Sequence, residues 1–430
     1  MNLTPVTLYL ISMIPKHLLT LILSLCLFFG LRAQQDVLIS YEHIAHLSIE
    51  DIQHRYKALG IPKMITPIRY PIDIYDIIYY TELPDGERIR ASGIYFVPQL
   101  ENGEALPVVQ YNHGTAFKMR GEGSYDYNGE KDVATFYATD GYAIAWQDYI
   151  GLGKVNDHFH PYQHAETEGR SGYDLLRALR EVNLELDITW NDHLFVTGYS
   201  QGGHAAMAVH KYIQEHPEAN LSVTASSPMS GAYDMAGAQS VTMFQEYTQP
   251  WYLPYLIYGY ESIYDEIEGP TEAVFKPPYD TLIPNMYDGN HDRFDFNKVL
   301  PSVPADMVVD SIVHLFKTDS NFFFTRLLKE NALWNWVPES PMQICYCKAD
   351  EEVFYKNALV AHEYMKENGA VHNRLRHSGK KFNHFDCAGF SAIYTKFYFD
   401  SFRKGSTRGR KGPIMKRFMI SMAKLFTKVK

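Results

Sequence analysis

The sequence predicts an α/β fold in which helices cover both faces of a mostly parallel sheet. Strand-like and helix-like segments alternate over most of the 430 residues, and several strand segments are continuous apolar runs. Strands buried on both faces need apolar side chains throughout, and parallel strands need crossover helices between them. The chain also has 32 Tyr, 24 Phe and 5 Trp, enough to fill a large core and still surround a pocket with rings.

The predicted elements begin with a hairpin. Residues 72–83 and 89–97 are rich in β-branched and aromatic side chains, and Pro84-Asp85-Gly86 between them is a turn signal. Further elements follow in alternation: strand 106–112, a short helix 133–139, strand 142–146, helix 167–182, strand 193–197, helix 201–214, strand 221–225, strand 341–347, helix 355–368, strand 371–377 and helix 387–402.

The alternation is interrupted by residues 233–338. This segment is too long for a simple loop in a compact domain, so we expect an inserted cap, with an ordinary second subdomain as the alternative. Within it Trp251, Tyr252, Tyr255 and Tyr258 follow in quick succession and are candidate walls of a substrate pocket. The expected core then consists of residues 34–232 and 339–402.

The first 33 residues resemble a targeting segment. Lys16 and His17 precede an apolar run over 18–31, and Ala33 is a plausible cleavage point. A run of this length suits the core of a signal peptide and is short for a membrane span. We expect export to the cell exterior or periplasm, with an uncleaved anchor as the alternative. Of the three remaining cysteines, Cys345 or Cys347 could pair with Cys387, or all three could be buried as small apolar residues.

Charge is distributed unevenly along the chain. Residues 34–402 hold 28 basic and 50 acidic side chains, whereas residues 403–430 hold ten basic and no acidic ones. So acidic a body argues against nucleic acid and other polyanions as partners. In the tail, residues 413–430 have helical periodicity with apolar and basic side chains on different sides. This pattern suits the surface of an anionic membrane. Docking on the acidic body and a frayed end are the alternatives.

Two sets of tail residues define that pattern. The apolar side comprises Ile414, Met415, Phe418, Met422, Leu425 and Val429. The basic side comprises Lys416, Arg417, Lys424 and Lys428.

The motif Gly198-Tyr-Ser-Gln-Gly202 is the centre of the predicted chemistry. An apolar strand leads into it and a helix-prone segment leads out, as a sharp strand–turn–helix carrying a nucleophile requires. A serine hydroxyl needs a base, and the base needs an orienting carboxylate. We therefore predict Ser200 as nucleophile, Asp350 as the acid after the next core strand, and His384 as the base before the last helix.

Rival residues and the oxyanion site follow from position. Glu351 and Glu352 are rivals of Asp350, and His377 is a rival of His384 although it ends a predicted strand. Two backbone N–H groups should stabilise the oxyanion, one from Gln201 and one from Thr115 in the loop after strand 106–112.

These motifs resemble the secretory lipase family within the α/β-hydrolase fold. The similarity covers residues 50–400 and includes Ala91-Ser-Gly93, Tyr111-Asn-His-Gly-Thr115, Asp148-Tyr-Ile-Gly-Leu-Gly153, His160-Pro-Tyr-Gln-His164, Gly198-Tyr-Ser-Gln-Gly202 and Trp336-Val-Pro338. The resemblance implies a lidded pocket, hydrolysis of a small-molecule or lipid ester, and no metal or other cofactor.

Two other function classes stay open at this point. A serine peptidase similar to prolyl oligopeptidases would use the same triad, but no blade-like repeat precedes this domain. A non-catalytic binding protein on the same scaffold is expected to have lost a triad member. The spacing His158-x-His160-x₃-His164 could suggest zinc, yet no nearby acid or thiol completes a site, so we expect no metal.

Overall fold

The computed structural model describes residues 36–59, 65–100, 103–119, 124–126, 129–265, 271–287 and 290–427. The chain divides into two compact units, Met1–Val37 and Leu38–Lys430. The expected targeting segment, 1–33, lies outside the described residues, and the second unit carries the fold. Among the described residues, no helix is both long and apolar enough to cross a bilayer.

A nine-stranded sheet runs through the second unit in the order β1-β2-β3-β5-β4-β6-β7-β8-β9. Its strands are β1 (Leu38–Leu47), β2 (Ile72–Glu82), β3 (Arg88–Pro98), β4 (Leu106–Asn112), β5 (Ala143–Gln147), β6 (Trp190–Tyr199), β7 (Val223–Met229), β8 (Met342–Cys347) and β9 (Asn373–Gly379). The pairs from β5 through β9 are all parallel, and the first three strands are antiparallel to their neighbours. Of the strands after β3, β4 and β5 are short and buried at every residue, as expected for strands in the middle of the sheet.

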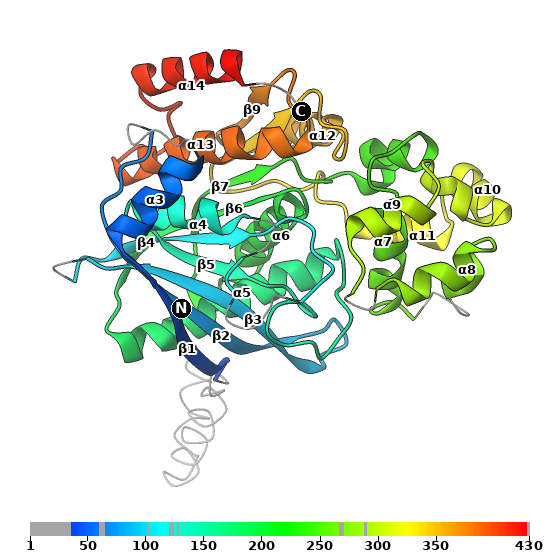
Figure 1. Cartoon of the computed structure of the whole chain (residues 1–430), viewed down its shortest axis with the longest axis horizontal. Helices are drawn as coiled ribbons and strands as arrows, with labels where there is room; N and C mark the ends of the chain where they lie inside the picture. Colours follow the sequence, from blue (N-terminus) through cyan, green and yellow to red (C-terminus); the bar gives the residue numbers. More distant parts are fainter. Residues whose placement is uncertain are drawn as a thin grey trace, which may run out of the picture. The chain divides into compact units, whose positions relative to one another are not determined.

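Helices cover both faces of this sheet (Figure 1). One face is covered by α3 (Ile49–Leu59), α4 (Lys131–Ala138) and α13 (His384–Arg403), whose apolar side chains share one core cluster. On the other face lie α5 (Ala165–Leu186), α6 (Gln201–Glu215) and α12 (Lys356–Glu367); α5 packs on α6, and α6 and α12 share a second cluster. The predicted elements of the core are thus present, whereas β1 and α3 were not predicted.

Between β7 and β8 the described chain is mostly helical, and we call residues 230–341 the cap. It contains α7 (Tyr252–Glu261), α8 (Tyr279–Leu282), α9 (Arg293–Val299), α10 (Asp310–Thr318) and α11 (Phe323–Glu330), joined by short 3₁₀ and π turns. These helices supply most of a separate apolar cluster, to which Tyr162 and Val353 outside the cap also belong. In Figure 1 the cap stands to one side of the sheet. This helical segment includes residues 233–338, for which the sequence predicts an inserted cap.

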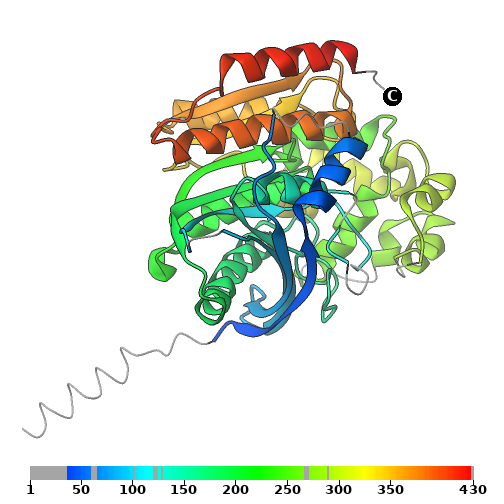
Figure 2. The ribbon, with the colours of Figure 1, turned by 60° about the vertical axis from the view of Figure 1, so that its left-hand side comes forward.

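The basic tail forms α14 (Ile414–Phe426), which lies along α13 (Figures 1 and 2). Ile420 is buried in the core cluster of α13, and the ammonium groups of Lys416 and Lys424 lie over the rings of Phe397 and Tyr394. The tail therefore docks on its own body through aromatic rings. Val429 and Lys428, assigned above to its two sides, lie outside the described residues.

Candidate active site

Ser200 occupies a sharp turn between β6 and α6. Its backbone has φ 60° and ψ −121°, a conformation that costs energy for a residue with a side chain and must be held by its surroundings. The Ser200 N–H donates to the carbonyl of Met229 at 3.0 Å, and its carbonyl accepts from Gly203 N–H at 2.8 Å. These two hydrogen bonds hold the turn between the end of β6 and the first turn of α6.

Asp350 and His384 form a close pair beyond β8 and β9. The Nδ1 atom of His384 lies 2.8 Å from Oδ1 of Asp350, and both side chains are almost fully buried. The same carboxylate oxygen accepts the N–H of Val353 at 2.9 Å, which holds it in place. His384 is the first residue of α13, so it lies at the helix start and not in the preceding loop as expected. His377 lies within β9.

A disulfide joins Cys347 at the end of β8 to Cys387 in the first turn of α13. It therefore ties the strand that leads to Asp350 to the helix that begins with His384. Cys345 is a buried free thiol, so of the two pairings considered from sequence the bond uses Cys347.

Glu352 lies on the opposite side of the imidazole from Asp350. Its Oε2 is 3.8 Å from Nε2 of His384 and accepts from Tyr252 Oη at 2.8 Å, while Oε1 accepts from Gln249 Nε2 at 2.9 Å. Burial lowers the pKa of His384, but the charges of Asp350 and Glu352 more than offset this and raise its pKa to about 9. Sequence reasoning considered Glu352 only as a rival acid and missed this position.

Glu130 is a second carboxyl group, partly buried, that sequence reasoning missed. It accepts from Gly114 N–H at 2.8 Å and from Tyr111 Oη at 2.6 Å, and burial raises its pKa to about 7. The contact anchors the loop after β4, whose register places Asn112 beside Gly198 at the same sheet edge as Ser200. Thr115, a predicted oxyanion donor, follows Gly114 in this loop, and its hydroxyl lies 2.9 Å from Tyr162 Oη.

Gln201, the other predicted oxyanion donor, is the first residue of α6 and fully buried. Its side-chain Nε2 lies 2.9 Å from Glu168 Oε1 and 2.8 Å from His160 Nε2. Glu168 is also 2.6 Å from His204 Nδ1. This network of buried side chains fixes the start of α6 directly after Ser200.

Ser200 and His384 line one cavity of ≈ 890 Å³. Its wall also contains Thr115, Glu130 and Glu352, so two of the three predicted triad residues and the two additional carboxyl groups surround one space. Cap residues close the far side, among them Trp251 and Tyr252, two of the predicted wall residues.

Tyr255 and Tyr258, the other two predicted wall residues, are packed among neighbouring rings and line neither cavity that Ser200 borders. Tyr255 stacks on Tyr162 and Tyr287 and donates its hydroxyl to the Ala116 carbonyl at 2.8 Å, so its ring is occupied by neighbours. Tyr258 lies against Phe159 and Phe275. Neither ring is part of the walls of the cavities described here, because both are packed between α7 and residues of the 116–162 segment.

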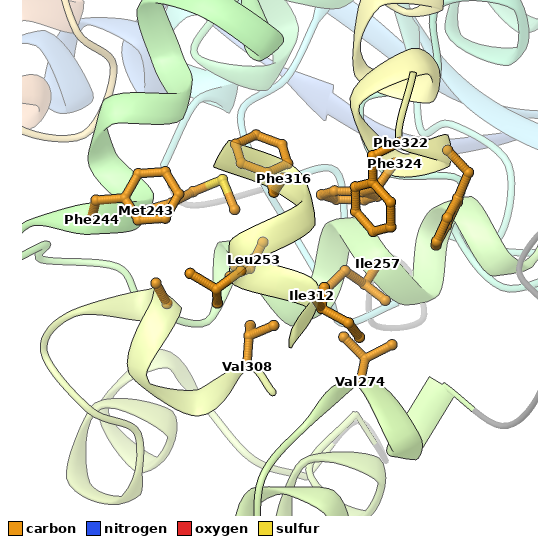
Figure 3. A pocket seen from close by; sticks show the side chains of 13 residues that line it. Met243, Phe244, Leu253, Ile257, Val274, Val308, Ile312, Phe316, Phe322 and Phe324 are labelled. Atoms are coloured by element: carbon orange, nitrogen blue, oxygen red, sulfur yellow. The ribbon is translucent and has the colours of Figure 1, made fainter. Parts of the chain in front are cut away.

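Ser200 also borders a second, smaller cavity of ≈ 80 Å³ inside the cap. Met243 and Leu253 line this cavity and also a third one, of ≈ 40 Å³, whose exposed wall is entirely apolar. In Figure 3 the side chains of the third cavity converge from several cap helices, with Leu253, Ile257 and Val308 facing Phe316 and Phe324. The two small cavities therefore lie next to each other, and Ser200 borders the first of them.

The histidines of the 158–164 stretch have structural contacts. His160 Nδ1 lies 2.9 Å from the Ile150 carbonyl, and burial lowers the pKa of His160 to about 3. His164 Nδ1 lies 3.2 Å from Thr167 N–H at the start of α5. Within the part of the chain that the structure describes, no group of three or more His, Cys, Asp or Glu side chains could hold a metal ion.

Solved structures similar to this chain share its fold over most of their length. A Legionella pneumophila protein provisionally assigned as a hydrolase is 26% identical with a TM-score of 0.77, and the match covers 86% of this chain and 98% of that one. The rice cell wall degrading esterase LipA from Xanthomonas oryzae is 24% identical with a TM-score of 0.71, covering 84% and 95%. Candida antarctica lipase A in its closed state is 14% identical with a TM-score of 0.62, covering 88% and 83%.

No family model matches the sequence, and no curated protein matches it either. The fold is nevertheless clear from the parallel sheet, the serine turn after β6, the acid after β8 and the histidine at the start of α13. Together with the similar solved structures, these features show that the chain has the α/β-hydrolase fold.

Proposed function

We propose that this protein is a serine hydrolase that cleaves carboxylic esters through an acyl-enzyme on Ser200. The observation that carries the proposal is the shared cavity, in which a serine on a strained turn and a histidine held by a buried carboxylate face the same space. The resemblance of the fold to an esterase and a lipase supports ester substrates over amides.

The proposed reaction uses these groups in sequence. The hydroxyl oxygen of Ser200 attacks the ester carbonyl while His384 Nε2 takes the hydroxyl proton. Asp350 stabilises the resulting imidazolium through Nδ1. Backbone N–H groups of Gln201 and Thr115 stabilise the oxyanion. His384 then gives the proton to the leaving alcohol, and water completes the cycle by the same route. None of these steps needs a cofactor.

The alcohol part and the acyl part of the ester are assigned to different cavities. His384 must reach the leaving alcohol, and it lines the large cavity but not the apolar path into the cap. The acyl chain therefore enters the cap past Met243 and Leu253, where apolar walls exclude water and favour a hydrocarbon.

A covalent probe tests the mechanism directly. Ser200→Ala should abolish ester turnover and labelling by a fluorophosphonate, and peptide mapping of the labelled wild type should identify Ser200. Asp350→Asn and His384→Ala should each lower kcat by several orders of magnitude. Full turnover in Ser200→Ala, or a label on another serine, would contradict the proposal. Amides of aminoacyl-proline, assayed beside the esters, separate it from a peptidase.

We also propose that the protein is exported and that residues 1–33 are removed. The apolar run over 18–31 and the Cys347–Cys387 disulfide support this, since such bonds persist in oxidising compartments. N-terminal sequencing of the protein recovered from the producing cell should begin near residue 34; a chain that retains residues 1–33 would favour the anchor instead.

Contact of α14 with an anionic membrane is a further part of the proposal. Its outward side carries exposed apolar side chains, including Ile414 at 82% and Phe426 at 77% exposure, and the preceding segment supplies exposed Arg and Lys. The intact protein should sediment with anionic vesicles at low salt, and a variant ending at Phe402 should not. Equal sedimentation of the two proteins would contradict membrane contact.

A further inference from the structure

Glu352 brings a carboxylate into the part of the cavity where the alcohol must leave. Its side chain lines the large cavity together with His384 and Ser200 but is not part of the walls of the smaller cap cavities. Only 8% of the residue is exposed, so its charge is poorly screened by solvent. A substrate group that enters this space meets a carboxylate held within the protein.

The position of the carboxylate relative to the ester follows from the proposed mechanism. His384 Nε2 passes its proton to the leaving oxygen, which must come within about 3 Å of that nitrogen. Glu352 Oε2 lies 3.8 Å from the same nitrogen. The carboxylate is therefore at most about 7 Å from the leaving oxygen. A hydroxyl on the carbon next to the ester-bearing carbon bridges this distance.

The two carboxylate oxygens of Glu352 can still accept hydrogen bonds from a substrate. Tyr252 Oη donates to Oε2 and Gln249 Nε2 donates to Oε1, and both donors belong to the cap. Each carboxylate oxygen can accept two hydrogen bonds, so each can take a further donor. Its backbone carbonyl is fixed by Tyr247 Oη at 2.7 Å and Gln239 Nε2 at 2.9 Å. The group is thus oriented before any substrate binds.

We propose that Glu352 is a specificity-determining residue that selects esters whose leaving alcohol carries a free hydroxyl beside the ester oxygen, as in partial esters of polyols. The inference rests on the proposed ester hydrolysis. The hydroxyl donates to the carboxylate, and a charge-assisted hydrogen bond of this kind discriminates more strongly than a neutral one. An alcohol that bears an anion beside the ester is rejected by repulsion.

A matched series of butanoate esters tests the proposal. The alcohols are ethylene glycol, 2-methoxyethanol, 1-propanol and choline. The group beside the ester is then a hydroxyl donor in the first ester, an ether acceptor in the second and an alkyl group in the third. In the fourth it is a cation that has no hydrogen-bond donor. The wild type should prefer the 2-hydroxyethyl ester to the 2-methoxyethyl ester by about 10- to 100-fold in kcat/KM, the range expected for a hydrogen bond to a charged group. Glu352→Gln should reduce this ratio to a few-fold.

The ratio between two esters cancels any general effect of the substitution on His384. Glu215→Gln, at the exposed C-terminal end of α6, removes the same charge elsewhere and should keep the wild-type ratio. The wild-type ratio needs no variant, so it stands even if Glu352→Gln folds poorly. Equal rates for the hydroxyethyl and methoxyethyl esters in the wild type, or an undiminished ratio in Glu352→Gln, would overturn the proposal.

Two other outcomes are distinct from these. A preference for the choline ester alone would overturn the hydroxyl proposal in favour of cation recognition. If the wild-type protein hydrolyses none of the four esters, the proposed ester hydrolysis is wrong, and the role proposed for Glu352 is wrong with it.

Discussion

Replacing Glu352 by Gln should make a simple ester turn over faster at neutral pH. Only the neutral imidazole of His384 can accept the serine proton, and the pKa of about 9 keeps most of it protonated at pH 7. Removing a negative charge from beside Nε2 destabilises the imidazolium, so the pKa must fall. A larger fraction of neutral His384 then forms at pH 7.

The size of the change follows from the 3.8 Å separation. Two unit charges at this distance interact by about 1 kcal/mol in water and about 4 kcal/mol at an effective dielectric constant of 20. These limits correspond to a fall of about 1 to 3 pKa units. At pH 7 the rate should rise about tenfold or more, because the neutral fraction grows about tenfold per unit while the pKa stays above 7.

The measurement is kcat/KM against pH for propyl butanoate, which has no hydroxyl beside its ester oxygen. The ascending limb reports the free-enzyme base and should move from near pH 9 to lower pH in Glu352→Gln. Glu215→Gln should keep the wild-type limb. A limb that stays in place, or that moves to higher pH, would refute the electrostatic reasoning even if the triad is intact.

Three other substitutions test the surrounding structure. Replacing Cys347 and Cys387 together by Ser should lower the free energy of unfolding by up to about 4 kcal/mol, since the bond closes a loop across a separation of 40 residues; an unchanged urea midpoint would contradict this. Glu130→Gln should keep near-wild-type stability, whereas Glu130→Ala leaves Gly114 N–H without its acceptor and should cost about 1–3 kcal/mol in thermal or urea unfolding; equal losses would be the contrary result. Leu253→Trp should fill the path into the cap and lower the rate for long acyl chains while sparing acetate esters; a uniform loss would count against the assigned acyl path.

Local signals explain why the sequence predicted the core elements closely. The segment after Gly198 combines a buried strand, a tight turn and a helix, and each part is visible without knowledge of distant residues. The order serine, acid, histidine then narrowed the choice to Asp350 and His384. β1 was missed because most of its side chains are at least partly exposed, so Leu38–Leu47 lacks the apolar run of a central strand.

The remaining site residues depend on contacts that no local pattern reveals. Glu352 is held in the site by Tyr252 and Gln249 of the cap, which precede it by 100 and 103 residues. Glu130 likewise meets the loop at Gly114 through tertiary packing. Tyr255 and Tyr258 have the same side chain as Tyr252. Only the positions of the three residues around helix α7 decide that Tyr252 lines the cavity and the other two do not.

The glycines around the serine turn limit how this protein can change its substrates. A Cβ on Gly198 or Gly202 would collide with the Asn112 carbonyl, and one on Gly203 would collide with the Met229 carbonyl. These contacts are backbone against backbone, so no neighbouring side chain can move aside. The three glycine positions of the nucleophile turn are therefore closed to side-chain variation. New substrate preferences must arise away from them, at cavity walls such as Leu253 in the cap or Glu352 beside the imidazole, where side chains can be exchanged without moving the backbone of the turn.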